Sequence, residues 1–209
     1  MKGLFISLEG NEGAGKTTAA YTLKKELEER GYPVLYTREP GGSQIAEQIR
    51  DVLLDFSNTN MDPKTEAILY AASRRQHLSE ILKPALEKGT IILCDRFIDS
   101  SLVYQGIARN LGIEEVEALN MYATDNLWPD LTLLLLVDVE TGLKRVQKRG
   151  EINRMDQESL AFHKDVKKGY ELLAKRYPER IRTIDANKNQ DETAEECLKI
   201  ILDKLNHDQ

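Results

Sequence analysis

The 209-residue sequence predicts an α/β fold in which helices cover both faces of a parallel sheet. Short apolar runs alternate with amphipathic stretches along the whole chain, and strands that alternate with helices usually pair in parallel. The run at 131–137 is almost wholly apolar, as expected of a central strand covered on both faces. The apolar elements are evenly spread, without a repeat or a low-complexity linker, so residues 1–209 are predicted to form one domain.

In the first half of the chain, glycine, proline and capping residues mark the ends of the elements. Asp62 followed by Pro63 predicts a helix start, with the aspartate as N-cap and proline in the first turn. Pro84 predicts a kink or break in that helix, because proline has no backbone N–H. The predicted elements are a strand at 4–8, a helix at 17–30, a strand at 34–36, a helix capped by Ser43 and ending near 54, a helix at 62–88 and a strand at 90–94.

The second half continues the alternation, with one interruption. A short polar stretch at 149–157 separates two predicted helices. The last helix, beginning before Ala194, carries its apolar residues on one face at helical spacing. The predicted elements are helices near 101–106 and 114–123, a strand at 131–137, helices at 140–148 and 158–176, a strand at 182–185 and the final helix.

Composition excludes several classes of protein. The net charge of −6 argues against a nucleic-acid scaffold, so an anionic ligand must be held by a focused cluster of Arg and Lys. Cys94 and Cys197 are predicted to be packing residues, and the three histidines lack metal-ligand spacing. No signal peptide and no apolar run long enough to cross a bilayer is found, which predicts a cytoplasmic protein without a membrane partner.

A phosphate-binding loop follows the first predicted strand. Residues 10–17 match the pattern G-x-x-x-x-G-K-[ST] in full, between a strand and a helix. Glycines let successive N–H groups point at phosphate oxygens, and the helix N-terminus adds positive charge. Lys16 is expected to bridge the β- and γ-phosphates, and the Thr17 hydroxyl to bind Mg²⁺. The alternative is a glycine-rich turn without a ligand, which the full match in this context disfavours.

Three further segments bear on which molecule receives the phosphate. Residues 37–43, with the sequence Thr-Arg-Glu-Pro-Gly-Gly-Ser, follow the second strand, where ligands of open α/β sheets gather. Residues 71–75 lie inside a predicted helix and end in two arginines. Residues 95–106 begin with Asp-Arg-Phe directly after the third strand and contain Tyr-Gln-Gly.

Together with residues 149–154, Arg-Gly-Glu-Ile-Asn-Arg, these segments resemble the thymidylate kinase family over essentially the whole chain. The resemblance implies the P-loop kinase fold, with five parallel strands and a small lid at about 149–157. It implies phosphoryl transfer from ATP to dTMP, giving ADP and dTDP for dTTP synthesis, with Mg²⁺ as cofactor. Members of the family are usually homodimers. The helices at 62–88 and 113–123 could carry the interface, although core packing would explain their apolar faces equally well.

The chemistry of the acceptor supports the resemblance. A monophosphate is already ionised near neutral pH, so catalysis reduces to positioning and charge stabilisation, which requires several cations. The resemblance implies that Arg96 holds the acceptor phosphate, with Arg38 and Arg50 nearby. It also places Asp95 at Mg²⁺, directly or through water, beside Thr17; an ordinary strand-to-helix cap is the alternative.

Recognition of the base and sugar is implied for a second group of residues. Tyr70 would stack on thymine, at a position where the family usually has Phe, and Arg74 lies one turn along the same helix face to donate to a carbonyl. Ser101 and Gln105 would complete the base contacts, and Tyr104 would crowd the 2′ position. The remaining substrate residues are Glu12, Glu39 and Pro40.

The lid is expected to supply catalytic charge. Some family members carry an arginine where this chain has Gly13, so another cation must act here. Arg149 and Arg154 fit that role, and which of them contacts the phosphates and which the adenine is left open. Catalytic roles are thus predicted for Glu12, Lys16, Arg96, Arg149 and Arg154. The predicted ATP-binding residues are Gly10, Asn11, Glu12, Gly13, Ala14, Gly15, Lys16, Thr17, Thr18, Ala186 and Asn187.

Two other functions compete with this prediction. A deoxynucleoside kinase would need a carboxylate base, a role open to Glu39, but would have no acceptor phosphate for the arginines; a kinase for another monophosphate is also possible. A nucleotide-binding regulatory ATPase belongs to a different class. The GTPase motif Asn-Lys-x-Asp is incomplete, since residues 187–189 read Asn-Lys-Asn without the Asp.

Overall fold

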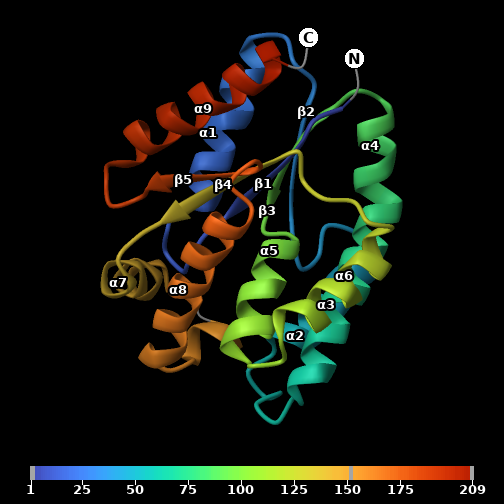
Figure 1. Ribbon diagram of the computed structural model, residues 1–209, viewed down its shortest axis with the longest axis vertical. Helices are drawn as coiled ribbons and strands as arrows, with labels where there is room; N and C mark the ends of the chain where they lie inside the picture. Colours follow the sequence, from blue (N-terminus) through green and yellow to red (C-terminus); the bar gives the residue numbers. More distant parts are fainter. Residues whose placement is uncertain (1–2, 151–152, 208–209) are drawn as a thin grey trace.

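The computed structural model describes residues 3–150 and 153–207, except for the side chains of Arg149 and His207. Its centre is a five-stranded sheet in the order β2-β3-β1-β4-β5, and every neighbouring pair is parallel (Figure 1). The strands are β1 (Phe5–Glu9), β2 (Val34–Arg38), β3 (Ile91–Asp95), β4 (Leu131–Leu136) and β5 (Ile181–Asp185). The predicted α/β fold with a parallel sheet is therefore confirmed.

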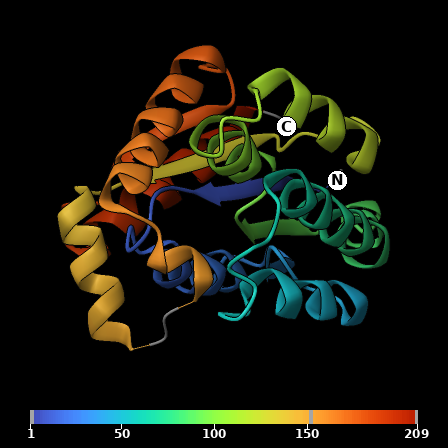
Figure 2. The same cartoon turned by 90° about the horizontal axis from the view of Figure 1, so that it is seen from below.

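Helices cover both faces of the sheet, and Figure 2 shows α1 and α8 on opposite sides of it. One apolar core lies under α1 and α9, and the other lies under η1, α5, η2 and α8. The helical elements are α1 (Lys16–Glu29), α2 (Gln44–Leu54), α3 (Pro63–His77), η1 (Leu78–Leu82), α4 (Lys83–Glu87), α5 (Ile98–Ser101), η2 (Leu102–Ala108), α6 (Ile113–Thr124), α7 (Val139–Arg149), η3 (Arg154–Gln157), α8 (Leu160–Arg176) and α9 (Gln190–His207).

Strand β1 shows how the sequence serves both cores. Ile6 and Leu8 point into the core under α1 and α9, whereas Phe5 points into the other core, since side chains alternate across a strand. The same alternation places Glu9 under α5 at the carboxyl end of the strand, where it is fully buried. The middle strand thus delivers a carboxylate to the edge of the sheet at which the phosphate loop begins.

Two helix boundaries test the predicted capping. Asp62 caps α3 as predicted, because its carboxylate accepts hydrogen bonds from the backbone N–H groups of Lys64 and Thr65. Ser43 occupies the N-cap position of α2, but its hydroxyl makes no cap hydrogen bond, which corrects that prediction. The carboxylate of Glu47 instead accepts from the N–H of Gly42, 2.7 Å away.

The predicted break before Pro84 takes the form of a π-helical turn. The turn η1 separates α3 from α4, in which Pro84 occupies the first turn. A second π-helical segment, η2, follows α5 where the sequence predicts an ordinary helix. Such wide turns often occur at functional sites. Within the described residues, no helix combines the length and the apolar character that crossing a membrane requires.

Candidate active site

A cavity of about 230 Å³ opens at the carboxyl ends of β1, β2 and β3. Such edges are where open parallel sheets bind ligands. Every residue predicted to bind the acceptor lines this cavity, together with most of the phosphate loop. The lining residues are Glu12, Gly13, Ala14, Gly15, Lys16, Thr17, Arg38, Glu39, Pro40, Arg50, Leu54, Tyr70, Arg74, Asp95, Arg96, Ser100, Ser101, Tyr104, Gln105, Asn153 and Met155.

The phosphate loop is held against the end of β4. The Asn11 amide donates to the carbonyl of Val137 at 3.1 Å and accepts from its N–H at 3.2 Å. Gly10 has a φ of 145°, and a Cβ there would overlap the carbonyl oxygen of Leu135. Lys16 donates to the carbonyls of Gly10 and Asn11 at 3.1 and 3.2 Å. Its ammonium therefore lies inside the loop, where phosphate oxygens would be bound.

Gly13 and Gly142 bring the phosphate loop against α7. Gly13 has a φ of 71°, and a Cβ there would overlap the carbonyl oxygen of Gly142. Arg145, on the same helix, donates to the carbonyls of Gly13 and Ala186 at 3.2 and 3.1 Å. Sequence reasoning missed Arg145, although it lies one helical turn before Arg149 and so shares its helix face.

Thr17 and Asp95, the two residues predicted to bind Mg²⁺, lie in direct contact. The hydroxyl of Thr17 donates to Oδ2 of Asp95 at 2.7 Å, between the start of α1 and the end of β3. Hydroxyl and carboxylate oxygens are ligands that Mg²⁺ accepts alongside water and phosphate. The donor set therefore fits Mg²⁺.

Arg96 is fixed between the phosphate loop and α8. Its Nη2 donates to Oε1 of Glu12 at 2.6 Å, and its Nη1 lies 3.2 Å from the carbonyl of Gly10 and from the hydroxyl of Tyr170. Arg96 has a φ of 70°, a strained backbone conformation of the kind that clusters at active sites. Burial raises the pKa of Glu12, but Arg96 and Lys16 outweigh it and lower this pKa to about 2. The pair is thus ionised on both sides.

Glu9, at the end of β1, binds three residues that surround Arg96. Its buried carboxylate accepts from the N–H of Phe97 at 2.7 Å and from the hydroxyls of Ser100 and Tyr170 at 2.6 and 2.9 Å. Burial and the nearby Asp99 raise its pKa to about 7. Sequence reasoning missed this residue, because Glu9 looks like an ordinary strand end until α5 and α8 enclose it.

Two more arginines meet at Pro40, just after the end of β2. Nη1 of Arg38 and Nη1 of Arg50 both donate to the carbonyl oxygen of Pro40, at 2.9 and 2.8 Å. Nη2 of Arg38 also donates to Glu47 at 3.1 Å. The two cations thus share one carbonyl oxygen at the cavity wall, which leaves most of their N–H groups to bind an anion.

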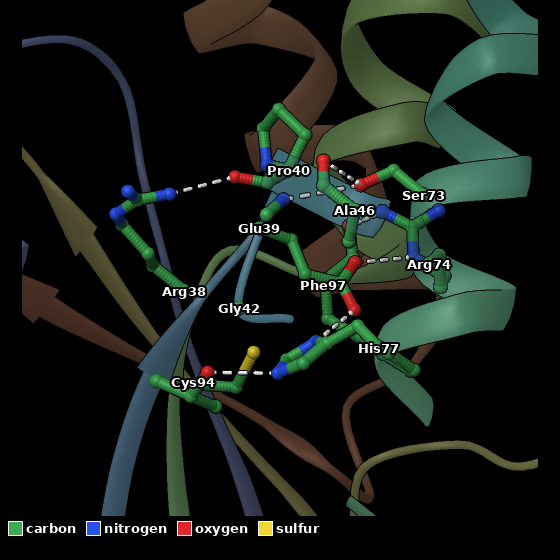
Figure 3. A network of polar contacts seen from close by, with 12 residues as sticks. Arg38, Glu39, Pro40, Gly42, Ala46, Ser73, Arg74, His77, Cys94 and Phe97 are labelled. Atoms are coloured by element: carbon green, nitrogen blue, oxygen red, sulfur yellow. Dashed lines mark hydrogen bonds and ion pairs between the residues drawn. The ribbon is translucent and has the colours of Figure 1, made fainter. Parts of the chain in front are cut away.

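Glu39 is the centre of a buried polar network (Figure 3). Its Oε2 accepts from Nε of Arg74 at 2.7 Å, and its Oε1 lies 2.9 Å from Nδ1 of His77. Nε2 of His77 lies 2.7 Å from the hydroxyl of Thr37. Glu39, His77 and Cys94 are close enough together to hold a metal ion. However, the Glu39 and His77 atoms are already hydrogen-bonded, so we interpret this group as structural.

Arg74 is held on three further sides. Its Nη1 donates to the hydroxyl of Ser101 at 2.9 Å and to the side-chain oxygen of Asn120, and its Nη2 donates to the carbonyl of Phe97 at 2.9 Å. The guanidinium has five N–H donors, so one N–H of Nη2 has no hydrogen-bond partner among the described residues. Because Arg74 lines the cavity, that N–H is available to a ligand.

Gln105 and Tyr70 complete the predicted base site. Nε2 of Gln105 donates to Oε1 of Glu66 at 2.9 Å. Tyr70 lines the same cavity, and burial together with Glu66 raises its pKa to about 12. Ser100 and Ser101 at the end of α5 reach the cavity together with Tyr104 and Gln105 of η2, because residues four apart lie on the same face of a helix. Sequence reasoning missed Glu66, whose function depends on neighbours far along the chain.

The predicted lid lies partly outside the described residues. Residues 151–152 and the side chain of Arg149 are not described, so the prediction for Arg149 is untested. Arg154 is buried and lies outside the cavity lining, because its Nη2 pairs with Oε2 of Glu66 at 2.6 Å and its Nε donates to the carbonyl of Leu53 at 2.9 Å. Its lid neighbours Asn153 and Met155 line the cavity instead. This part of the predicted lid therefore lies against α2 and α3, which the sequence did not predict.

The residues predicted to border the adenine do not all line one hollow, unlike those predicted for the acceptor. A small hollow beside the phosphate loop is lined by Ala14, Gly15, Ala19, Ala186, Lys188, Gln190 and Thr193. Asn187 is not part of this lining, and its side-chain oxygen accepts from the N–H of Asp138 at 3.1 Å. Thr18 is exposed on the first turn of α1. The structure therefore brings Ala186 to the phosphate loop but leaves Thr18 and Asn187 outside the hollow.

Comparison with known proteins gives one consistent result. Residues 8–197 match the family described as thymidylate kinase. The sequence is 53% identical over 206 residues to the thymidylate kinase of Halalkalibacterium halodurans, covering 98% of each chain. It is 52% identical to that of Bacillus pumilus, covering all of both chains. The crystal structure of thymidylate kinase from Ehrlichia chaffeensis has a TM-score of 0.79 to this chain at 30% identity, covering 96% of this chain and 100% of that one.

Proposed function

The chain belongs to the thymidylate kinase family, whose members phosphorylate dTMP to dTDP, and we propose that the cavity described above carries out this reaction with ATP as the donor. The observation that carries the proposal is the set of cations at the cavity wall. Arg38 of β2, Arg50 of α2 and Arg96, in the turn after β3, all line the cavity beside the phosphate loop. A nucleoside acceptor would have no phosphate for these groups to bind.

The protein's contribution to the reaction is mainly position and charge. Arg96 holds the acceptor phosphate beside the donor γ-phosphate, and Glu12 fixes the guanidinium that does so. Lys16 balances the charge on the transferring group. A monophosphate oxygen is the nucleophile and is already ionised, so Glu39, which is occupied by Arg74 and His77, is not needed as a base.

Thr17 and Asp95 are the residues that we propose for Mg²⁺. Their oxygens lie 2.7 Å apart beside the phosphate loop, and their chemistry suits this ion. When bound, Mg²⁺ supplies positive charge to the β- and γ-phosphate oxygens.

The lid arginines complete the proposal from the other side of the donor. Arg149 ends α7, whose residue Arg145 already touches the phosphate loop, so the helix is close enough to deliver a cation there. Arg154 can act on the phosphates only after its ion pair with Glu66 opens. Ala186 borders the adenine in this proposal, and Arg145 spans the gap between it and the loop.

We also propose a homodimer in the cytoplasm. Ile68 on α3 and Tyr122 on α6 are 55% and 87% exposed, which supports an interface on these two adjoining helices. Two free, buried cysteines suit a reducing compartment. Tyr122→Asp is expected to convert the dimer to a monomer in sedimentation velocity, and an unchanged sedimentation coefficient would place any interface elsewhere.

The experiment that tests the function is a substrate screen. The purified protein is incubated with ATP, Mg²⁺ and each common nucleoside or nucleoside monophosphate, and the products are separated by chromatography. Formation of dTDP, with weak turnover of the others, is expected. Phosphorylation of free nucleosides alone would contradict the proposal, and ATP hydrolysis without a phosphorylated product would indicate a regulatory ATPase.

A further inference from the structure

We propose that Glu66 selects the pyrimidine base by fixing the orientation of the Gln105 amide. The inference rests on the proposed function, because it concerns the base of the acceptor nucleotide. Glu66 and Gln105 are 1% and 2% exposed, and only Gln105 lines the cavity. Glu66 therefore acts through Gln105 and is a positioning residue.

The amide of Gln105 can face Glu66 in only one way. An ionised carboxylate accepts hydrogen bonds and cannot donate them. Gln105 must therefore turn its NH₂ group to Glu66, and the two atoms lie 2.9 Å apart. Its side-chain carbonyl oxygen, Oε1, makes no hydrogen bond within the described part of the chain. The oxygen is left for a donor that enters the cavity.

Three partners keep Glu66 in the ionised form. Nη2 of Arg154 lies 2.6 Å from its Oε2, and Nε of Arg109 lies 3.3 Å from its Oε1. Burial raises the pKa of Glu66, but the hydrogen bonds from Gln105 and the arginines outweigh it and lower the pKa. A protonated Glu66 could donate its O–H to Gln105, and the Gln105 amide would then be free to rotate. By keeping Glu66 ionised, the two arginines indirectly fix the orientation of the Gln105 amide.

The resulting pattern of donors and acceptors matches one kind of base. The cavity offers an acceptor at Gln105 and a remaining N–H donor at Arg74. Thymine presents an N3–H donor next to an O4 acceptor, so both groups are satisfied. Cytosine presents the reverse, a bare N3 next to an amino group, and would leave buried polar groups unpaired. The pair Glu66–Gln105 therefore discriminates against cytosine at N3.

Glu66→Gln tests this inference, with Glu158→Gln as the matched control. Both changes neutralise a glutamate that pairs with Arg109, but only Glu66 contacts Gln105. A glutamine at position 66 can donate as well as accept, so the Gln105 amide can rotate. The ratio of kcat/KM for dTMP to kcat/KM for dCMP is expected to fall about tenfold in Glu66→Gln, mainly through a higher KM for dTMP. It should remain within twofold in Glu158→Gln.

A double-variant cycle distinguishes positioning from a general structural effect. In a Gln105→Met background, Glu66→Gln is expected to leave the ratio unchanged, because no amide remains to be oriented. Three results would overturn the inference. The first is an unchanged dTMP-to-dCMP ratio in an active Glu66→Gln variant, and the second is an equal fall of this ratio in Glu158→Gln. The third is a further fall of the ratio when Glu66→Gln is added to Gln105→Met. If Glu66→Gln does not fold, Glu66→Asp keeps the charge and withdraws the carboxylate, and an unchanged ratio there overturns it. Wild-type protein that forms no dTDP would instead contradict the function itself, and with it this inference.

Discussion

On the side of the cavity proposed for the acceptor, carboxylates hold two of the arginines, whereas on the side proposed for ATP the loop lysine contacts backbone carbonyls. Arg74 and Arg96 pair with buried or half-buried carboxylates at 2.7 and 2.6 Å. On the ATP side, Lys16 lies against carbonyls of its own loop, and the lid's Arg154 is paired with α3.

This difference suits the two sides to different tasks, namely recognition of the acceptor base and binding of the donor triphosphate. Fixed side chains can distinguish one base from another, since a misplaced donor or acceptor is costly in a buried site. Backbone N–H groups of a phosphate loop bind any triphosphate and do not need to distinguish bases. The residues proposed for the acceptor are thus held by protein groups, whereas in our proposal the ATP side is completed by movement of the lid, which would also limit hydrolysis by water.

The largest expected effect comes from removing a cation of the acceptor side. Arg96→Gln is expected to lower kcat/KM for dTMP about a thousandfold, because the acceptor phosphate loses its anchor and Glu12 loses its partner. Steady-state kinetics with dTMP and ATP measure this. Arg176→Gln, which removes an exposed arginine paired with Glu114, serves as the control and should leave kcat/KM unchanged. A loss below tenfold in Arg96→Gln would mean that the acceptor phosphate is bound elsewhere.

The Glu12–Arg96 pair should also appear in the pH dependence of stability. The pKa of Glu12 falls from 4.5 to about 2 on folding, so its ionised form stabilises the protein above pH 4.5, and this contribution is lost as pH falls toward 2. The shift corresponds to roughly 3 kcal/mol. Between pH 5 and 3, the Tm of the wild type is expected to fall more steeply than that of Glu12→Gln. Parallel curves would show that the carboxylate gains nothing from Arg96.

Arg154→Ala tests whether the ATP side needs Arg154 from the lid for catalysis. If the lid moves Arg154 to the phosphates, kcat is expected to fall about a hundredfold while the affinity for ATP changes little. Arg154→Lys should recover part of the turnover, since a charge remains. A lower Tm with unchanged kcat would assign Arg154 to the ion pair with Glu66 alone and would leave the catalytic role to Arg149.

The smallest effect concerns the sugar. The hydroxyl of Tyr104 donates to Oε1 of Glu12 at 2.8 Å, on the wall where the 2′ position is proposed to lie. Tyr104→Phe opens room there, so the preference for dTMP over its ribonucleotide is expected to fall about fivefold. Competition assays with both nucleotides measure the ratio, and Tyr21→Phe, on an exposed part of α1, is the control. An unchanged ratio would place the sugar away from Tyr104.

Local patterns predicted the fold well, and they failed where long-range packing decides the geometry. The caps, apolar runs and phosphate loop are readable because the signals lie within a few residues, as at Asp62. The π-helical segments η1 and η2 are not readable, because packing widens these turns. Ser43 holds the expected position without the expected hydrogen bond, since Glu47 satisfies the neighbouring N–H of Gly42.

The candidate site divides along the same line. The segments after β1, β2 and β3 predicted the cavity lining, because parallel strands end at one edge of the sheet. The supporting residues His77, Asn120 and Glu66 were not predicted, because each acts through a partner 35 or more residues away in sequence. Arg154 was assigned from its lid motif, and its pairing with Glu66 became visible only in the folded chain.

The contact between Gly13 and Gly142 constrains how this enzyme could change over many generations. The resemblance implies that some family members carry an arginine in the loop, but a Cβ at position 13 in this chain would overlap the carbonyl oxygen of Gly142. A Cβ at Gly142 would in turn overlap the carbonyl oxygen of Glu12. Neither glycine position can therefore hold a larger side chain without a shift of the backbone. An arginine at position 13 would therefore require α7 to shift as well, so a single substitution there is expected to be costly. If the lid supplies the catalytic cation, as we propose, the packing of α7 against the loop would keep that role in the lid over many generations.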